Sequence, residues 1–246
     1  MAGSSDETED PAAASDHRPS SARRAGSAYL VRPEGSPGPG VLVLHSWWGL
    51  TPGVKAVVEQ LADQGYTALA PALLTGRPAD AGEAAALLAE TDADATAALV
   101  LSSIVALRAQ SADPDASVGI VGYSMGASWA LWAAARQPGS VAAVAAYYGY
   151  QDIDFAELRA EVLCHFAQSD PLITEDQATG MQAHLRLAGV TVEVEHHPGT
   201  RHFFAEADVP VLDADGTPGE RNPDEEAAAA AAWTSTVALL DRALRP

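Results

Sequence analysis

The sequence predicts an α/β fold: a single domain with a mostly parallel, doubly wound sheet flanked by helices. Short apolar runs of strand length alternate with longer segments whose apolar residues have helical spacing. Several of the runs are apolar throughout, as in Val41-Leu42-Val43-Leu44, which is typical of a strand covered on both faces. Because no internal repeat or second composition regime divides the chain, we expect one domain over residues 27–246 and a disordered tail over residues 1–26.

The expected strands are 28–31, 41–44, 66–70, 118–121, 141–146, 162–167 and 191–195. The expected helices are 54–64, one or two within 81–108, one ending near Arg136, 174–187 and 227–244. Thr51 and Pro52 form a start signal for the first helix, and Gly65 and Gly189 end two of them. The alternating strand at 191–195 is predicted to be half-exposed at the sheet edge, followed by a loop over 196–204 and an acidic segment over 206–226.

Composition excludes several classes of function. The 246-residue chain has a formal net charge of −19, which argues against nucleic acids and anionic membranes as partners. No apolar run reaches the ~20 residues of a membrane span, and no apolar core of a signal peptide is present, so we expect a cytoplasmic protein. A single cysteine, Cys164, excludes an intrachain disulfide and a multi-cysteine metal site. The histidine spacing indicates no metal site, and no cofactor is expected.

The most informative stretch is Gly122-Tyr123-Ser124-Met125-Gly126, which lies between a predicted buried strand and an alanine-rich helix. A G-x-S-x-G pattern is common by chance in a chain with 20 glycines, so the pentapeptide alone has little weight. Between a strand and a helix it predicts a nucleophile elbow, a sharp turn that presents the serine in strained geometry. Ser124 is therefore the predicted nucleophile.

A serine hydroxyl needs a histidine base, and that base needs a carboxylate to orient it. Asp170 follows the strand at 162–167 directly, although a turn-forming or helix-capping aspartate is the simpler alternative; Glu175 and Asp176 are weaker candidates. His202 lies in the loop after the last strand, beyond the pair His196 and His197. The order Ser124, Asp170, His202 is the one that α/β-hydrolases use.

The attack would also create an oxyanion that needs two donors. The backbone N–H of Met125 is one by position, and the N–H of Trp47, after an earlier strand, is the predicted second. Trp47 and Trp48 could instead pack the end of the sheet. Further candidates for substrate contact are Ser46, Trp48, Tyr123 and Phe203.

These motifs together resemble the dienelactone hydrolase family of α/β-hydrolases. The resemblance spans about residue 28 to the C-terminus and rests on His45-Ser46-Trp47-Trp48-Gly49-Leu50, Ala70-Pro71, Gly122-Tyr123-Ser124-Met125-Gly126, Ser169-Asp170-Pro171, Gly199-Thr200-Arg201-His202-Phe203-Phe204 and Ala231-Ala232-Trp233. It implies a small, metal-free α/β-hydrolase without a sizeable lid domain.

The chain departs from the family pattern at two places. The family's nucleophile is typically a cysteine, held partly by a glutamate in the first loop, whereas this sequence has Ser124 and Ser46 at the matching positions. The arginines that would hold a substrate carboxylate are not evident: Glu206 stands near the place of one, and Arg77 is at best near the other. A neutral ester or lactone therefore fits better than dienelactone.

The sequence thus predicts a serine hydrolase that cleaves carboxylic esters or lactones through an acyl-enzyme. The expected partner is a small-molecule substrate, and the expected assembly is a monomer or a small homo-oligomer. A thioesterase or peptidase-like acyl hydrolase is an alternative within the enzyme class. A catalytically inert α/β-hydrolase-fold protein that binds a ligand is the alternative from another class.

Overall fold

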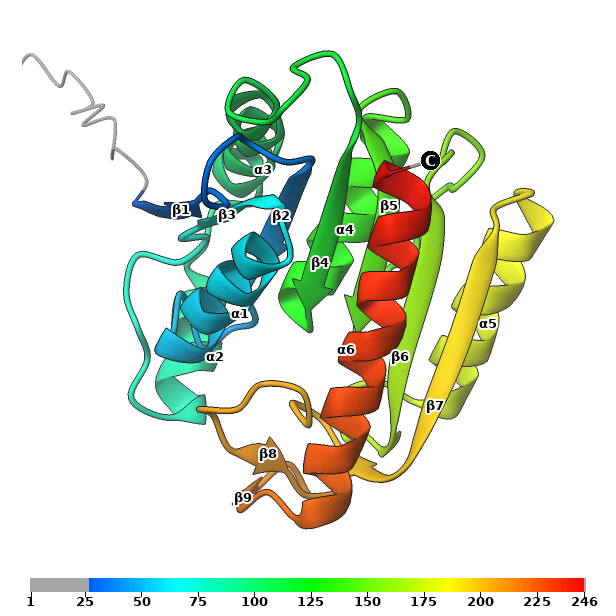
Figure 1. Cartoon of the computed structure of the whole chain (residues 1–246). Helices are drawn as coiled ribbons and strands as arrows, with labels where there is room; N and C mark the ends of the chain where they lie inside the picture. The colour runs from blue at the N-terminus through cyan, green and yellow to red at the C-terminus, as the bar shows by residue number, and fades with distance from the viewer. Residues whose placement is uncertain (1–26, 246) are drawn as a thin grey trace, which may run out of the picture.

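The computed structural model describes residues 27–245, so the predicted tail over 1–26 lies outside the described residues. A seven-stranded sheet has the order β1-β3-β2-β4-β5-β6-β7 (Figure 1). β1 pairs antiparallel with β3, and the other pairs are parallel. The strands are β1 (Ala28–Val31), β2 (Gly40–Leu44), β3 (Thr67–Pro71), β4 (Val118–Tyr123), β5 (Val141–Tyr147), β6 (Glu161–Ser169) and β7 (Val192–Arg201).

Helices cover both faces of this sheet. The side chains of α1 and α6 belong to one buried cluster, and those of α3, α4 and α5 belong to another on the opposite face (Figure 1). The helices are α1 (Pro52–Asp63), α2 (Ala81–Ala89), α3 (Ala93–Arg108), α4 (Met125–Arg136), α5 (Glu175–Leu187) and α6 (Pro223–Leu244). The single-domain, mostly parallel α/β prediction is confirmed.

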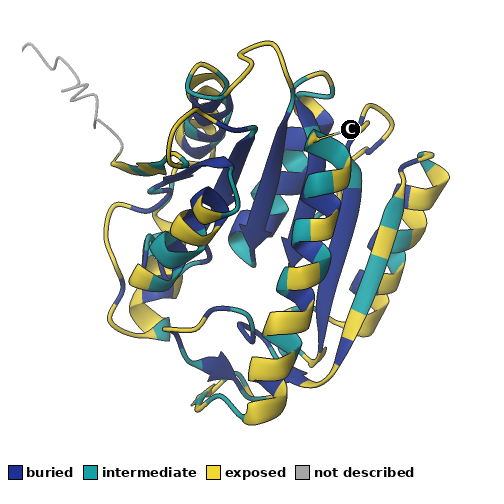
Figure 2. Ribbon diagram, viewed as in Figure 1, coloured by how far each residue is buried: buried dark blue, intermediate teal, exposed yellow. Residues whose placement is uncertain are grey.

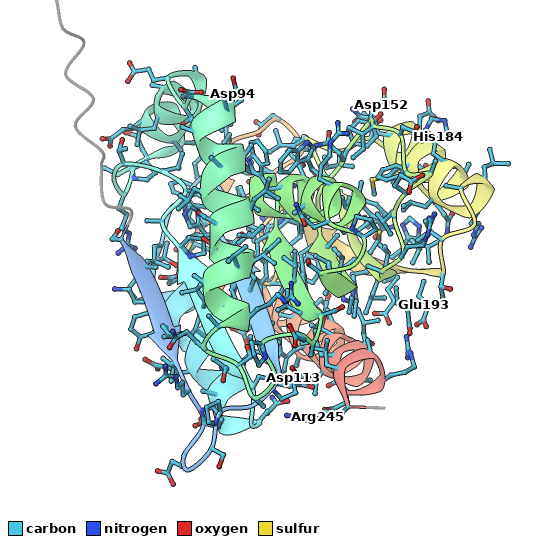
Figure 3. All side chains as sticks on the ribbon, turned by 90° about the horizontal axis from the view of Figure 1, so that it is seen from above. Asp94, Asp113, Asp152, His184, Glu193 and Arg245 are labelled. Carbon is cyan, nitrogen blue, oxygen red and sulfur yellow. The ribbon has the colours of Figure 1, made fainter. Side chains whose placement is uncertain are left out.

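Burial follows the sequence pattern. Every residue of β2, β3 and β4 is buried, as expected for apolar strands between two helical layers, whereas the outer faces of the helices are exposed (Figure 2). Charged side chains such as Asp94 on α3 and Glu193 on β7 lie at the periphery (Figure 3). Within residues 27–245, no helix is both long and apolar enough to cross a bilayer.

The predicted start and stop signals are present at the helix ends. The Thr51 side chain accepts a hydrogen bond from the Val54 N–H and so caps α1. The region 81–108 forms two helices because Asp92 caps α3 and interrupts the apolar spacing. The acidic segment 206–226 contains a short hairpin, β8 (Val211–Leu212) with β9 (Pro218–Gly219), that the sequence did not indicate.

The prediction for the edge strand was too short. β7 continues through the segment 196–201, which is part of the loop expected over 196–204, and so contains Pro198 and Gly199. The strand accommodates both residues because an edge strand leaves one side of its backbone unpaired, and a register irregularity opposite Ala167–Ser169 absorbs the bend. As a consequence, His202 follows the last residue of β7, Arg201, directly.

Candidate active site

Ser124 lies at the turn between β4 and α4, with φ 50° and ψ −115°. A non-glycine residue at positive φ is strained by ~1–3 kcal/mol, and such strain is concentrated at functional sites. Both flanking glycines are required by close backbone approach. A Cβ on Gly122 would lie 2.5 Å from the Gly126 carbonyl oxygen, and one on Gly126 would lie 2.1 Å from the Leu44 carbonyl oxygen. The elbow therefore tolerates no side chain at either position.

We expect Gly126→Ala to destabilise the fold by about 3 kcal/mol or more, because backbone rather than a flexible side chain opposes the new Cβ. Gly180→Ala is the matched control, since Gly180 lies inside α5 and a Cβ added there would meet nothing within 4 Å. That control should gain about 0.5–1 kcal/mol from its better helix propensity. Urea unfolding of both variants checks the pair, and equal effects would contradict the close-approach explanation.

The structure brings Ser124, His202 and Asp170 together from three strand ends. His202 Nε2 lies 2.8 Å from Ser124 Oγ, and His202 Nδ1 lies 2.7 Å from Asp170 Oδ2. The His202 side chain is 0% exposed and that of Asp170 is 3% exposed, whereas Ser124 is half-buried. Both contacts have hydrogen-bond length, so the imidazole bridges the hydroxyl and the carboxylate.

Asp170 and His202 are held firmly in these positions. The second carboxylate oxygen of Asp170 accepts hydrogen bonds from the backbone N–H groups of Leu172 and Ile173, at 2.8 and 3.0 Å. The His202 ring packs against Phe203, with centroids 4.3 Å apart, and against Tyr148, at 4.9 Å. The alternative candidates lie elsewhere: Glu175 and Asp176 are in the first turn of α5.

Of the two predicted oxyanion donors, Met125 follows Ser124 directly in the chain. Met125 is the first residue of α4, where helix geometry leaves the N–H without an intrahelical partner. Gly126 fits directly against Leu44 and His45, so the start of α4 touches the loop that carries Trp47. Within the part of the chain that the structure describes, neither the Met125 nor the Trp47 backbone N–H has a hydrogen-bond acceptor. The role of these two groups as oxyanion donors stays a prediction.

Sequence reasoning missed the role of Glu206 as a buried carboxyl beneath this loop. Ser46 Oγ donates to Glu206 Oε2 at 2.7 Å, and the Tyr148 hydroxyl donates to Oε1 at 3.2 Å. Glu206 is 5% exposed, and burial raises the pKa of its carboxyl to about 7 against the smaller opposing effect of those two hydrogen bonds. The signal that could have identified it is a glutamate directly after the apolar run Phe203-Phe204-Ala205.

Further contacts join the same two loops. Asp208 accepts hydrogen bonds from the Thr51 hydroxyl at 3.0 Å and from the Gly53 N–H at 2.9 Å. The Arg221 guanidinium donates to the backbone carbonyls of Phe203 and Glu206. The bonds of Asp208 link the segment 203–208, which follows His202, to the segment 46–53, which carries Trp47. Those of Arg221 hold the segment 203–208 from its other side in the sequence.

The other predicted substrate-contact side chains are largely buried. Ser46 and Phe203 are 0% exposed, Tyr123 is 2% exposed and Trp48 is 6% exposed. Phe203 has φ 70° and packs against Trp47 and Trp48, with centroids 5.7 and 6.1 Å apart. The contact of these residues with substrate stays a prediction.

Of the remaining histidines, His45 is a structural residue: its Nε2 accepts from the Leu73 N–H at 2.8 Å, and burial lowers its pKa to about 4. His184 lies at the outer side of α5 (Figure 3). His165 and His197 approach each other and Glu195 away from Ser124.

A comparison with protein families decides the assignment, because the model of the dienelactone hydrolase family matches residues 27–244. The chain belongs to the dienelactone hydrolase family. Similar curated proteins include Protein usf of Aquifex pyrophilus, 26% identical over 72% of this chain and 80% of that protein. The carboxymethylenebutenolidase of Rhodococcus opacus is 25% identical over 83% of this chain and 81% of that protein.

Solved structures of other hydrolases share the fold. A dienelactone hydrolase-like promiscuous phosphotriesterase from metagenomic libraries superposes with a TM-score of 0.75 at 22% identity, covering 89% of this chain and 92% of that one. The esterase PE8 superposes with a TM-score of 0.57 at 19% identity, covering 73% of this chain and 92% of that one. At these identities the likeness shows the α/β-hydrolase architecture alone.

The raised pKa of Glu206 makes stability depend on pH. The folded protein holds this proton up to about pH 7, whereas the unfolded chain loses it near the ordinary value of 4.5. The contribution of this proton to the unfolding free energy is therefore fully present below pH 4.5. It is lost as the pH rises to about 7, which lowers the unfolding free energy by on the order of 3 kcal/mol. In Glu206→Gln we expect this part of the pH dependence to vanish. Urea unfolding at pH 5 and pH 8 measures it, and parallel profiles for variant and wild type would contradict the assignment.

Proposed function

We propose that this member of the dienelactone hydrolase family is a serine hydrolase that cleaves neutral carboxylic esters or lactones through an acyl-enzyme. The observation that carries the proposal is the continuous chain of contacts Ser124 Oγ–His202 Nε2–His202 Nδ1–Asp170 Oδ2, with lengths of 2.8 and 2.7 Å. Membership of a hydrolase family supports the reaction class. The serine in place of the family's usual cysteine is part of the proposal.

In the first step His202 Nε2 takes the proton as Ser124 Oγ attacks the ester carbonyl. The negative charge that develops on the carbonyl oxygen is stabilised by the N–H groups of Met125 and Trp47. His202 then gives the proton to the leaving alcohol, and the acyl group stays on Ser124. In the second step His202 takes a proton from water, whose oxygen attacks the acyl carbonyl. As the bond between the acyl carbon and Ser124 Oγ breaks, His202 returns that proton to Ser124 Oγ and the acid is released. Asp170 keeps the imidazole oriented and stabilises its charged form throughout.

The charges around the site support a neutral substrate. Arg77 lies 4.0 Å from Asp208, and the Arg221 guanidinium is used by the backbone carbonyls of Phe203 and Glu206. Within residues 27–245, these arginines are therefore engaged by the protein itself. We therefore expect uncharged acyl groups to be preferred.

The test uses a series of p-nitrophenyl esters from acetate to octanoate and a fluorophosphonate probe. We expect turnover of the short esters and covalent labelling of one serine. Turnover of matched acyl thioesters at a higher kcat/KM than oxygen esters would favour the thioesterase alternative. Absence of both turnover and labelling would overturn the proposal in favour of an inert binding protein.

Ser46→Glu tests whether a serine nucleophile needs the loop glutamate typical of the family. Ser46 is fully buried and lies 2.7 Å from Glu206, so a second carboxyl would be placed beside the first. We expect a loss of about 3 kcal/mol in unfolding free energy and no gain in esterase activity, because two adjacent buried carboxyls cannot both ionise. Ser46→Ala, which removes the hydroxyl without adding charge, is the control. An activity gain in Ser46→Glu would show that the position still serves the nucleophile.

A further inference from the structure

A second cluster of titratable side chains lies on the sheet outside the candidate active site. His165 on β6 is paired with Glu195 on β7, and His197 lies two residues further along β7 on the same face. That face is covered by α6, which contributes Thr236. The sequence did not indicate this cluster, because the three residues come from two strands whose register decides that they meet.

The three facing atoms are close and nearly equidistant. His165 Nδ1 lies 3.1 Å from His197 Nε2 and 3.3 Å from a carboxylate oxygen of Glu195, and that oxygen lies 3.8 Å from His197 Nε2. A triangle with these edges has a circumradius of about 2.0 Å, so a single point is about 2.0 Å from all three atoms. This equals the bond lengths of Zn²⁺ to histidine nitrogen and carboxylate oxygen, which are about 2.0–2.2 Å.

The surroundings also suit a metal ion. His165 Nε2 lies 3.1 Å from the Thr236 hydroxyl, which contacts the Tyr147 hydroxyl at 2.7 Å. Such a partner on the far ring nitrogen is what metal-bound histidines usually have, since it fixes the tautomer that turns the other nitrogen toward the ion.

The cluster is open on one side only. The His165 side chain is 0% exposed and that of His197 is 8% exposed, whereas that of Glu195 is 36% exposed at the sheet edge. An ion would enter past Glu195 and keep a fourth position for water. We propose that His165, Glu195 and His197 bind one Zn²⁺ ion, which links the edge strand β7 to β6.

Two imidazoles with one carboxylate favour zinc over magnesium or calcium, which select oxygen ligands. The ion would stabilise the fold, since it binds the paired strands and not the separated ones. The ion would lie at the middle of β6 and β7, about five residues before Asp170 and His202 along the two strands.

The experiment uses the full, untagged chain, freed of metal with a chelator. Calorimetric titration with Zn²⁺ should show one equivalent bound, Tm should rise with Zn²⁺, and Co²⁺ should give the visible absorption bands of a low-symmetry site. Glu195→Gln and His197→Gln should each weaken Zn²⁺ binding at least about tenfold, and Thr236→Val about tenfold. His196→Gln is the matched control, because His196 is exposed and stacks on Phe166 on the opposite face, and it should bind as wild type does.

Three outcomes would overturn the proposal. One is the absence of saturable Zn²⁺ binding by the wild-type chain, which would leave the 3.1 Å contact as a hydrogen bond between two neutral histidines. Another is unchanged affinity in both ligand variants, which would place the ion elsewhere, for example on His202 and Asp170. The last is a loss of Zn²⁺ affinity in His196→Gln as large as the loss in the two ligand variants. Circular dichroism of each apo variant distinguishes lost ligands from a lost fold.

Discussion

Ser124→Ala is expected to lower the kcat of ester hydrolysis by about 10⁴-fold or more and to abolish labelling by a fluorophosphonate. The reason is that the alanine leaves no group on the elbow that can form the acyl-enzyme, although the oxyanion donors and His202 remain. The fold should be kept, because Ser124 is half-buried and its backbone geometry is fixed by the neighbouring glycines. Steady-state kinetics and mass spectrometry of the labelled protein measure both effects.

Ser128→Ala is the matched control for this result. Ser128 lies one turn further along α4, and its hydroxyl donates to the Tyr150 carbonyl at 2.6 Å rather than to His202. It should keep activity within a few-fold and should still be labelled. Labelling that persists in Ser124→Ala would remove Ser124 from the proposed mechanism, whatever the activity.

Asp170→Asn is expected to reduce kcat by about 10⁴-fold with little change in stability. Oδ1 would continue to accept from the Leu172 and Ile173 N–H groups, so the turn should hold. The amide nitrogen would replace Oδ2 and donate to His202 Nδ1. The imidazole hydrogen would then sit on Nε2, facing Ser124, where a base is needed.

Two neighbouring acidic residues provide the control. Glu175→Gln and Asp176→Asn alter the first turn of α5 without touching His202, and both should retain kcat within about twofold. A fall in either that matches Asp170→Asn would mean that the local negative charge, and not the orientation of the imidazole, supports activity.

The order of elements could be predicted because each signal is local. Buried strands such as Val41–Leu44 are indicated by continuous apolar residues, and Thr51 and Asp170 stand at positions that follow from strand and helix boundaries. The parallel sheet then brings the three strand ends to one edge, which is why Ser124, Asp170 and His202 could be named before their distances were known.

Contacts that depend on loop conformation could not be predicted in the same way. The sequence distance between Ser46 and Glu206 is large, and neither residue carries a motif that names the other. Only the folding of the segment after His202 under the loop of Trp47 brings them to 2.7 Å. The apolar run at 203–205 indicates that this segment is buried, but not against which loop.

Strand register was the other limit. The difference between a loop and an extended β7 at 196–201 depends on pairing with β6 around an irregularity, and Pro198 favoured the loop. With that register, His165 faces Glu195 and His197 follows on the same side. If β7 were shifted by one residue against β6, Glu195 and His197 would both face α5, and the cluster with His165 would not form.

The bonds of Glu206 and Asp208 to the segment 46–53 have a consequence for engineering the pocket. Loops 46–53 and 203–208 are separated by about 150 residues in sequence, but the conformation of each depends on hydrogen bonds to the other. A graft that exchanges one of them with a relative would leave buried polar groups of the other without partners. Loop libraries that vary both segments together should therefore yield more folded variants than libraries that vary either one.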